Sequence, residues 1–403
     1  MVAIHEIPLD TCAAGPAEGA VAFNLIEDAQ TDRLYRFCAQ TWEVELRRGG
    51  GHVVARTTDK LTRSALLNAA IDVTNRALDL LSIEGQEHLN TRAPASDCVL
   101  LVRESGRVIV RFSAVSDFPI RSHFSIEVRR GDGTVEPQAA VATPAWTPAF
   151  RFYRLAQSGR DLFDAYRNMF LALEALLDQL FPKNRREGEK VWLVRSVAAV
   201  GSKVDLPSLA SPGAIDLASD IVDRLYGIRV QLFHAKSGRA LLPDERVGYT
   251  AVAEAYPILV KLCTEIIRRW LGPPRGSSVV TYQGFRLMIE NAFAATAVAV
   301  TADDTLAKHS DTAASPRGLP LVTFASPAEV LETSPGRMTL EGRTDVAALP
   351  PRQSVGRVVV LMNGQTVVVS SITGGLVLDG ADIFETATTL RLVNPDLPRT
   401  EFL

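Results

Sequence analysis

The chain has 403 residues, 47% of them hydrophobic and 22% charged, which suits a globular protein of several domains at roughly 100–200 residues each. Its four cysteines are widely spaced and form no Cys-x-x-Cys pair, which argues against a disulfide framework or a zinc site and predicts a cytoplasmic protein without metal or cofactor. No apolar run approaches the roughly 20 residues of a membrane helix, so we expect no membrane span and no signal peptide.

Residues 1–149 mix helical and strand patterns, which predicts an N-terminal α+β domain. Apolar residues at helical spacing predict a helix over Leu61–Leu81. A stretch rich in Ala, Thr and Pro, Pro137–Pro148, predicts a linker to the next domain. Runs of β-branched or alternating residues predict three strands, the first two joined as a hairpin: Cys98–Val102, Val108–Phe112 and Ile120–Arg130.

Residues 150–272 are the most regular part of the sequence and predict a central all-helical domain, a four-helix bundle. This block carries 18 Lys and Arg against 14 Asp and Glu, whereas both flanking blocks are acidic, so an anionic partner would bind here. The four predicted helices are Leu155–Leu180, Glu187–Val200, Ala214–Phe233, and a last one from Asp244 to Leu271 with a kink at Pro257.

Residues 273–403 are rich in strand signals and predict a small β-rich C-terminal domain. Asn363-Gly364 lies between two β-branched runs and predicts a tight hairpin. Thr301–Pro320, with its clustered Asp, Ser, Gly and Pro, predicts a flexible loop or linker. The sequence as a whole therefore predicts a multi-domain α+β protein.

Arg229 is the most unusual residue of the third predicted helix. At 100° per residue it lies about 40° from Leu225, inside the apolar stripe of that helix. An arginine in this position must pair, extend to solvent or face a partner, because burial of an unpaired charge costs several kcal/mol. His234 follows five residues later, near the expected end of the helix, where a cationic side chain is favoured.

The segment Arg229-Val-Gln-Leu-Phe-His234 resembles the R-x4-6-H motif of HEPN domains, and the helix Asp164–Glu174 is similar to that of the Apea-like HEPN group and the methylamine-utilisation J-type proteins. The resemblance covers about residues 150–272. It implies a homodimer through the helical domain that cleaves RNA without metal. It further implies roles for six residues: Arg229 binding the scissile phosphate, His234 acting on the 2′-OH, Glu174 and Arg224 in support, and Lys236 and Arg239 contacting RNA.

Two functions are open. The first is a metal-independent endoribonuclease or RNA-binding protein of stress response or defence. The second is a non-catalytic helical interaction protein, such as an accessory protein of a methylamine-utilisation operon, in which Arg229 forms a structural ion pair with Glu174 or another carboxylate on a helix. Val230 favours the second function, because active HEPN members often carry Asn, Asp or His directly after the arginine.

Overall fold

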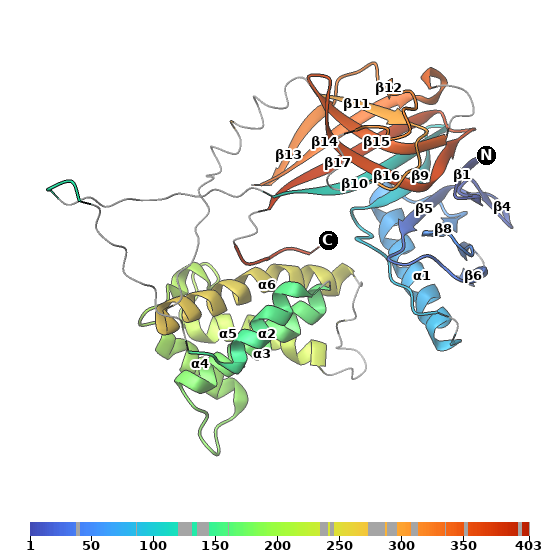
Figure 1. Ribbon diagram of the computed structural model, residues 1–403. Coiled ribbons are helices and arrows are strands. Elements are labelled where there is room, and N and C mark those ends of the chain that lie inside the picture. The colour runs from blue at the N-terminus through green and yellow to red at the C-terminus, as the bar shows by residue number, and fades with distance from the viewer. Residues whose placement is uncertain are drawn as a thin grey trace. The chain divides into compact units, whose positions relative to one another are not determined.

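The chain forms two units, each described here by itself (Figure 1). The β unit takes Met1–Ile120 and Val280–Val393, and the helical unit takes Arg121–Val279 and Asn394–Phe402. The computed structural model describes residues 1–37, 41–85, 87–119, 131–134, 145–159, 161–233, 241, 246–272, 287, 296–307, 313–334, 336–349, 354–393 and 397–402.

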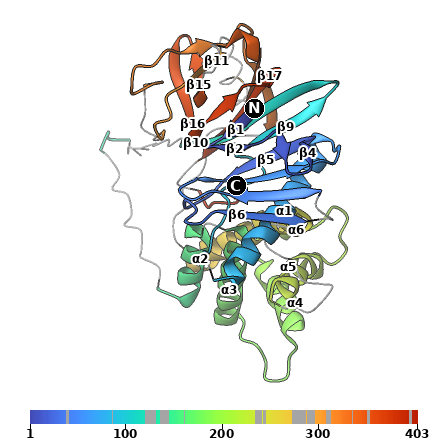
Figure 2. The same cartoon turned by 90° about the vertical axis from the view of Figure 1, so that its right-hand side faces the viewer.

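A nine-stranded sheet, as counted over the described residues, dominates the β unit, and its strands can be followed from β6 to β10 in Figure 2. Its strand order is β13 (Glu329–Ser334), β14 (Arg337–Asp345), β17 (Ile383–Val393), β10 (Arg107–Pro119), β9 (Cys98–Glu104), β5 (Gly19–Asn24), β8 (His52–Thr57), β7 (Trp42–Leu46) and β6 (Arg33–Phe37). The predicted hairpin is present as β9 and β10. Ser105 and Gly106 turn the chain with positive φ angles of 51° and 77°, as a tight hairpin of this kind requires.

The centre of this sheet joins the two ends of the chain. β10 pairs in parallel with β17, from Ile109 opposite Ile383 to Pro119 opposite Val393. Parallel neighbours need a long crossover connection, and here the connection contains the whole block 121–279. The N-terminal and C-terminal thirds of the sequence therefore build one sheet.

A second sheet covers one face of the first and has the order β12 (Val322–Thr323), β11 (Thr296–Thr301), β15 (Ser354–Met362), β16 (Gln365–Leu378), β1 (Val2–Ile4) and β2 (Ile7–Pro8). β3 (Thr11–Cys12) and β4 (Gly15–Pro16) form a separate pair. The hairpin predicted at Asn363-Gly364 is confirmed as the connection of β15 to β16. Apolar side chains from both sheets form one buried core, among them Ile4, Leu101, Val358 and Phe384.

Helix α1 (Arg63–Ile83) covers the opposite face of the large sheet and matches the helix predicted over Leu61–Leu81. Thr62 caps its first turn by accepting a hydrogen bond from the N–H of Ala65 at 3.4 Å. Leu66, Ala70 and Ala77 recur at helical spacing and pack against the sheet.

A buried carboxylate, Glu385 of β17, binds the chain segments of the β unit together. Arg63 at the start of α1 donates to it at 2.6 Å, and Arg343 of β14 and Arg111 of β10 lie 3.3 and 3.6 Å away. Only 8% of the Glu385 side chain is exposed, so these cations replace its lost hydration.

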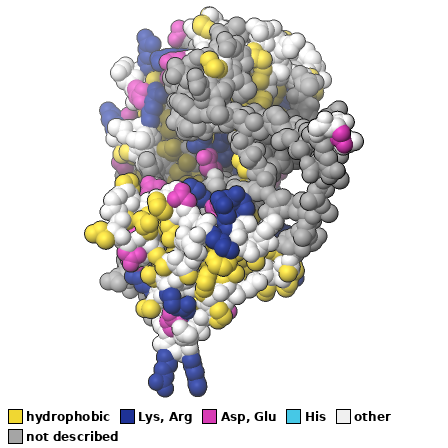
Figure 3. All heavy atoms as spheres, turned by 90° about the vertical axis from the view of Figure 1, so that its left-hand side faces the viewer, with side chains coloured by type: hydrophobic (Ala, Val, Ile, Leu, Met, Phe, Trp, Pro, Cys, Tyr) yellow, Lys and Arg dark blue, Asp and Glu magenta, His cyan; other side chains and the backbone are white. Residues whose placement is uncertain are grey.

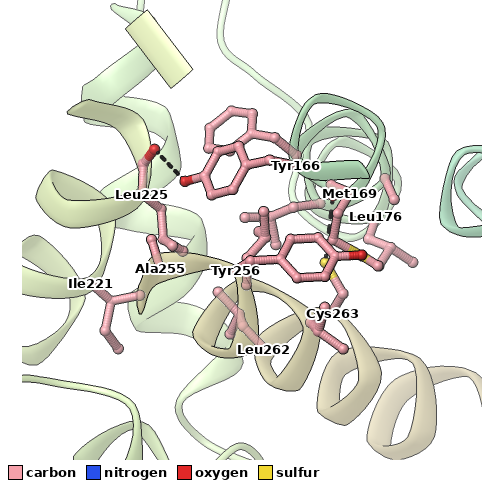
Figure 4. Packing of buried hydrophobic residues seen from close by; sticks show 14 of the residues in the cluster. Tyr166, Met169, Leu176, Ile221, Leu225, Ala255, Tyr256, Leu262 and Cys263 are labelled. Carbon is pink, nitrogen blue, oxygen red and sulfur yellow. Dashed lines mark hydrogen bonds between the residues drawn. The ribbon is translucent and has the colours of Figure 1, made fainter. Parts of the chain in front are cut away.

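The described residues of the helical unit form five α-helices: α2 (Pro148–Ser158), α3 (Leu162–Leu180), α4 (Glu189–Val200), α5 (Leu217–Phe233) and α6 (Arg246–Ile266). A 3₁₀ turn, η2 (Leu206–Ser208), precedes α5, and a π-helical turn, η3 (Ile267–Leu271), continues α6. Apolar side chains of these helices form one buried core, within which the buried Tyr166 hydroxyl donates to the carbonyl oxygen of Leu225 at 2.8 Å (Figure 4).

The predicted fold class is wrong. The N-terminal and C-terminal regions are not separate α+β and β-rich domains, because they share the nine-stranded sheet. Among the described residues of 150–272, a central, self-contained four-helix bundle is also not found. The helix predicted over Leu155–Leu180 is two helices, broken where Gly159 turns extended and Asp161 caps α3, and the helical core is completed by Phe402 from the end of the sequence.

Two predictions concern residues that the structure does not describe in full. The strand at Ile120–Arg130 and residues 137–144 of the linker at Pro137–Pro148 lie outside the described residues.

The segment Thr301–Pro320, as far as it is described, is not a linker. The buried carboxylate of Asp303 accepts hydrogen bonds from Thr305, Ser315 and Arg317, which order the segment internally. Arg357 of β15 donates to the carbonyl oxygen of Thr305 at 2.8 Å and joins the segment to the six-stranded sheet.

Candidate functional site

Arg229 lies on α5 in a partly buried cluster of aromatic and charged side chains. Tyr226, Arg229 and Phe233 recur three and four residues apart and therefore share one face of the helix. The Arg229 guanidinium carbon lies 5.0 Å from the centre of the Phe233 ring and 5.6 Å from that of Tyr226. Only 19% of the Arg229 side chain is exposed, so its charge needs partners within the protein.

Two carboxylates from other helices supply these partners. Arg229 Nη2 donates to Glu189 Oε1 at 3.0 Å and lies 3.8 Å from Glu174 Oε1. The Tyr226 hydroxyl donates to the second oxygen of Glu189 at 3.1 Å. Because Glu174 comes from α3 and Glu189 from the first turn of α4, the cluster cross-links three helices.

The two glutamates are close enough to influence each other's protonation. Burial, together with a hydrogen bond to Glu189 and its negative charge, raises the pKa of Glu174 to about 7, against the opposing effect of Arg229. Burial acts in the same direction on Glu189, but hydrogen bonds from Glu174 and Tyr226 and the charge of Arg229 outweigh it and lower the pKa of Glu189. Near neutral pH the pair therefore holds a proton on Glu174 for part of the time, beside an ionised Glu189.

This arrangement limits what Arg229 can bind. A phosphate group would have to displace Glu189 from the guanidinium and would meet its negative charge at close range. In chemical terms the cluster is a cross-link between three helices in which Arg229 compensates carboxylate charge.

Of the three predicted site residues that the structure describes, Arg229 and Glu174 lie together. Arg224 lies on the same helix but outside the cluster, where its Nη1 donates to the carbonyl oxygen of Leu209 at 3.3 Å and lies 4.0 Å from Asp220. His234, Lys236 and Arg239 lie outside the described residues, so their pairing with Arg229 stays a prediction.

Sequence reasoning missed Glu189, Tyr226 and Phe233. Tyr226 lies three residues before Arg229 and Phe233 four residues after it, and this spacing could have predicted that both flank Arg229 on one helix face. Glu189 gave no such signal, because it belongs to a different helix and its contact depends on tertiary packing.

Comparison with protein families, characterised proteins and solved structures gives no significant match for this chain. The resemblance to HEPN domains therefore stays a prediction drawn from the motif. Within the described part of the chain, no helix combines the length and the apolar character needed to cross a bilayer.

Proposed function

We propose that this protein is a non-catalytic interaction protein whose helical unit binds a macromolecular partner. The observation that carries the proposal is the engagement of Arg229 by Glu189 and Glu174, which makes this arginine a structural cross-link. A guanidinium that already balances carboxylates from two helices is poorly suited to bind a scissile phosphate.

The surface of the helical unit supports an interaction role. Large apolar side chains are exposed on it, including Trp146 at 66% and Val191 at 64%. In the lower half of Figure 3, hydrophobic side chains lie next to Lys and Arg side chains over this unit. Exposed apolar groups bordered by charge are typical of binding surfaces, and we include a homodimer through the helical unit in the proposal.

A cytoplasmic location belongs to the same proposal. Three cysteines of the described residues, Cys12, Cys98 and Cys263, are buried and free. Unpaired cysteines are usual in reducing compartments.

The decisive experiment removes Arg229. Arg229→Ala leaves Glu174 and Glu189 facing each other without their cation, and we expect it to lower the free energy of unfolding by about 2–3 kcal/mol, the lower end for a partly buried ion pair. Arg224→Ala is the matched control on the same helix, because that side chain lies outside the cluster, and it should cost less than about 1 kcal/mol. Urea unfolding followed by circular dichroism measures both values.

The same variants decide the catalytic question. We expect the wild-type protein to leave RNA intact in EDTA. If it cleaves RNA under these conditions, and Arg229→Ala abolishes the cleavage without loss of stability, the proposed function is wrong.

A second candidate function, RNA binding with or without cleavage, is favoured by one observation. The Phe233 ring is 42% exposed and has the guanidinium carbons of Arg229 and Arg167 at 5.0 and 6.0 Å from its centre. Exposed aromatic rings beside arginines are the elements on which single-stranded nucleic acids stack. Fluorescence anisotropy with a labelled single-stranded RNA, in the presence and absence of 0.5 M salt as a rough screening condition, tests this candidate.

A further inference from the structure

The helical unit contains a second feature, distant from Arg229 in the sequence, in which a short segment is bound like a peptide ligand. Leu397–Phe402 forms no helix or strand, yet it joins the helical core between α2 and α6. Its contacts come from side chains of these two helices, as they do when a helical groove holds an extended peptide.

Gln157 of α2 recognises the main chain of this segment. Its side-chain oxygen accepts a hydrogen bond from the N–H of Arg399 at 2.5 Å, and its side-chain nitrogen donates to the carbonyl oxygen of the same residue at 3.2 Å. One amide side chain thus satisfies both polar groups of a single backbone residue. Such a contact depends on extended geometry and does not depend on the identity of the bound residue.

Phe402 supplies a specific anchor three residues later. Only 8% of Phe402 is exposed, and its ring meets that of Tyr256 of α6 edge to face at a centroid distance of 5.4 Å. The hydroxyl of Tyr249, two turns earlier on α6, donates to the carbonyl oxygen of Phe402 at 2.9 Å. The guanidinium carbon of Arg399 lies 3.5 Å from the centre of the Phe402 ring, on the bound segment itself.

Gln157 of α2 and Tyr249 and Tyr256 of α6 line the groove that holds this segment. We propose that this groove is a peptide-binding site, occupied in cis by Leu397–Phe402 and open to a peptide of the same chemistry from a partner protein. The peptide has an extended residue held by Gln157 and an aromatic side chain three positions later that fills the socket beside Tyr256. The segment is held by an aromatic anchor and by hydrogen bonds to Gln157 and Tyr249, all of which a separate peptide can also form. The covalent link gives the cis segment the advantage of a high effective concentration. This inference rests on the proposed interaction role, since it specifies the binding site on the helical unit and the kind of peptide that binds there.

The test uses the full chain and a fluorescein-labelled synthetic peptide with the sequence of residues 394–403. In the wild type the cis segment competes with the peptide. In Phe402→Ala the anchor is lost but every groove residue remains, so we expect the peptide to bind at least about tenfold more tightly than to the wild type. Fluorescence anisotropy measures the affinity. The same peptide carrying Phe402→Ala is the control ligand and should not bind to either chain.

A second variant guards against a folding defect. Arg399→Pro removes the N–H from which Gln157 accepts a hydrogen bond, together with the guanidinium beside the Phe402 ring, and leaves every residue of α2 and α6 in place. It should also bind the peptide at least about tenfold more tightly than the wild type does. If both variants keep their helical circular dichroism and neither binds the peptide more tightly than it binds the control peptide, the groove is not a peptide site.

Two further outcomes separate the alternatives. A wild-type dimer that Phe402→Ala abolishes would overturn the assignment to a partner protein and make a second copy of the chain the occupant. If the peptide does not bind, the groove is not a peptide site, but the structural role proposed for Arg229 is unaffected. RNA cleavage that depends on Arg229 would instead overturn the proposed function itself.

Discussion

Arg229 shows how one residue can be identified from the sequence while its role is decided by residues far away. Its position in the apolar stripe of a helix predicts that it needs a partner, either Glu174 or another carboxylate on a helix. The structure confirms that it lies near Glu174 and adds Glu189, the closer of the two carboxylates. Because burial and the neighbouring Glu189 raise the pKa of Glu174 to about 7, we expect the cluster to be sensitive to pH.

Glu174→Gln tests this sensitivity. The pKa of Glu174 is raised from 4.5 to about 7 by folding, so the folded protein binds a proton more tightly than the unfolded chain. Protonation of Glu174 therefore adds to the free energy of unfolding, by roughly 2 kcal/mol after allowance for solvent screening. This contribution is fully present below pH 4.5 and is lost as the pH rises through 7. We expect the wild-type helical unit to be less stable at pH 8 than at pH 5 on this account, and Glu174→Gln to reduce the difference.

Urea unfolding at both pH values measures this effect. Asp178→Asn replaces an exposed carboxylate on the same helix and should keep the wild-type difference. An identical pH dependence in the wild type and Glu174→Gln would show that Glu174 titrates normally.

At the scale of elements, local patterns located helices and hairpins well. The stripes of α1, α4 and α5 and the Asn363-Gly364 turn are found where they were predicted, because each depends on residues close in the sequence. The break between α2 and α3 was missed, since the apolar spacing continues across Gly159. The sequence predicts a flexible loop or linker after β11, because the partners of the buried Asp303 are not evident in the sequence.

Gly356→Ala tests how closely this segment packs on β15. A methyl group at Gly356 would lie 2.5 Å from the main-chain carbonyl of Asp303, so one of the two backbones would have to shift. We expect a loss of about 2–3 kcal/mol in the free energy of unfolding, the upper range for overpacking. Gly227→Ala in α5 is the contrasting variant, because nothing lies within 4 Å of its added methyl group. It should stabilise the protein by about 0.5–1 kcal/mol through helix propensity. Equal melting temperatures for the two variants would contradict the close packing at Gly356.

At the scale of the whole molecule, the parallel pair of β10 and β17 makes the first and last thirds of the chain interdependent. A fragment of residues 1–120 would leave β10 as a long edge strand and expose half of the core between the sheets. We expect this fragment to aggregate when it is expressed alone and to become soluble when it is co-expressed with residues 280–393. Co-purification through a tag on one fragment measures this. A monomeric 1–120 fragment that unfolds cooperatively would mean that the N-terminal third folds without the C-terminal strands.

The sequence by itself determined the local elements and the residue at the centre of the candidate site. Helical periodicity, turn residues and a charge in an apolar stripe are properties of a few neighbouring residues, so they can be recognised along the chain. The tertiary structure alone decided that β10 pairs with β17, that Glu189 is the nearest partner of Arg229, and that Phe402 completes the helical core. These contacts join residues 40 to more than 200 positions apart, and their stability comes from burial and charge pairing that no local pattern records.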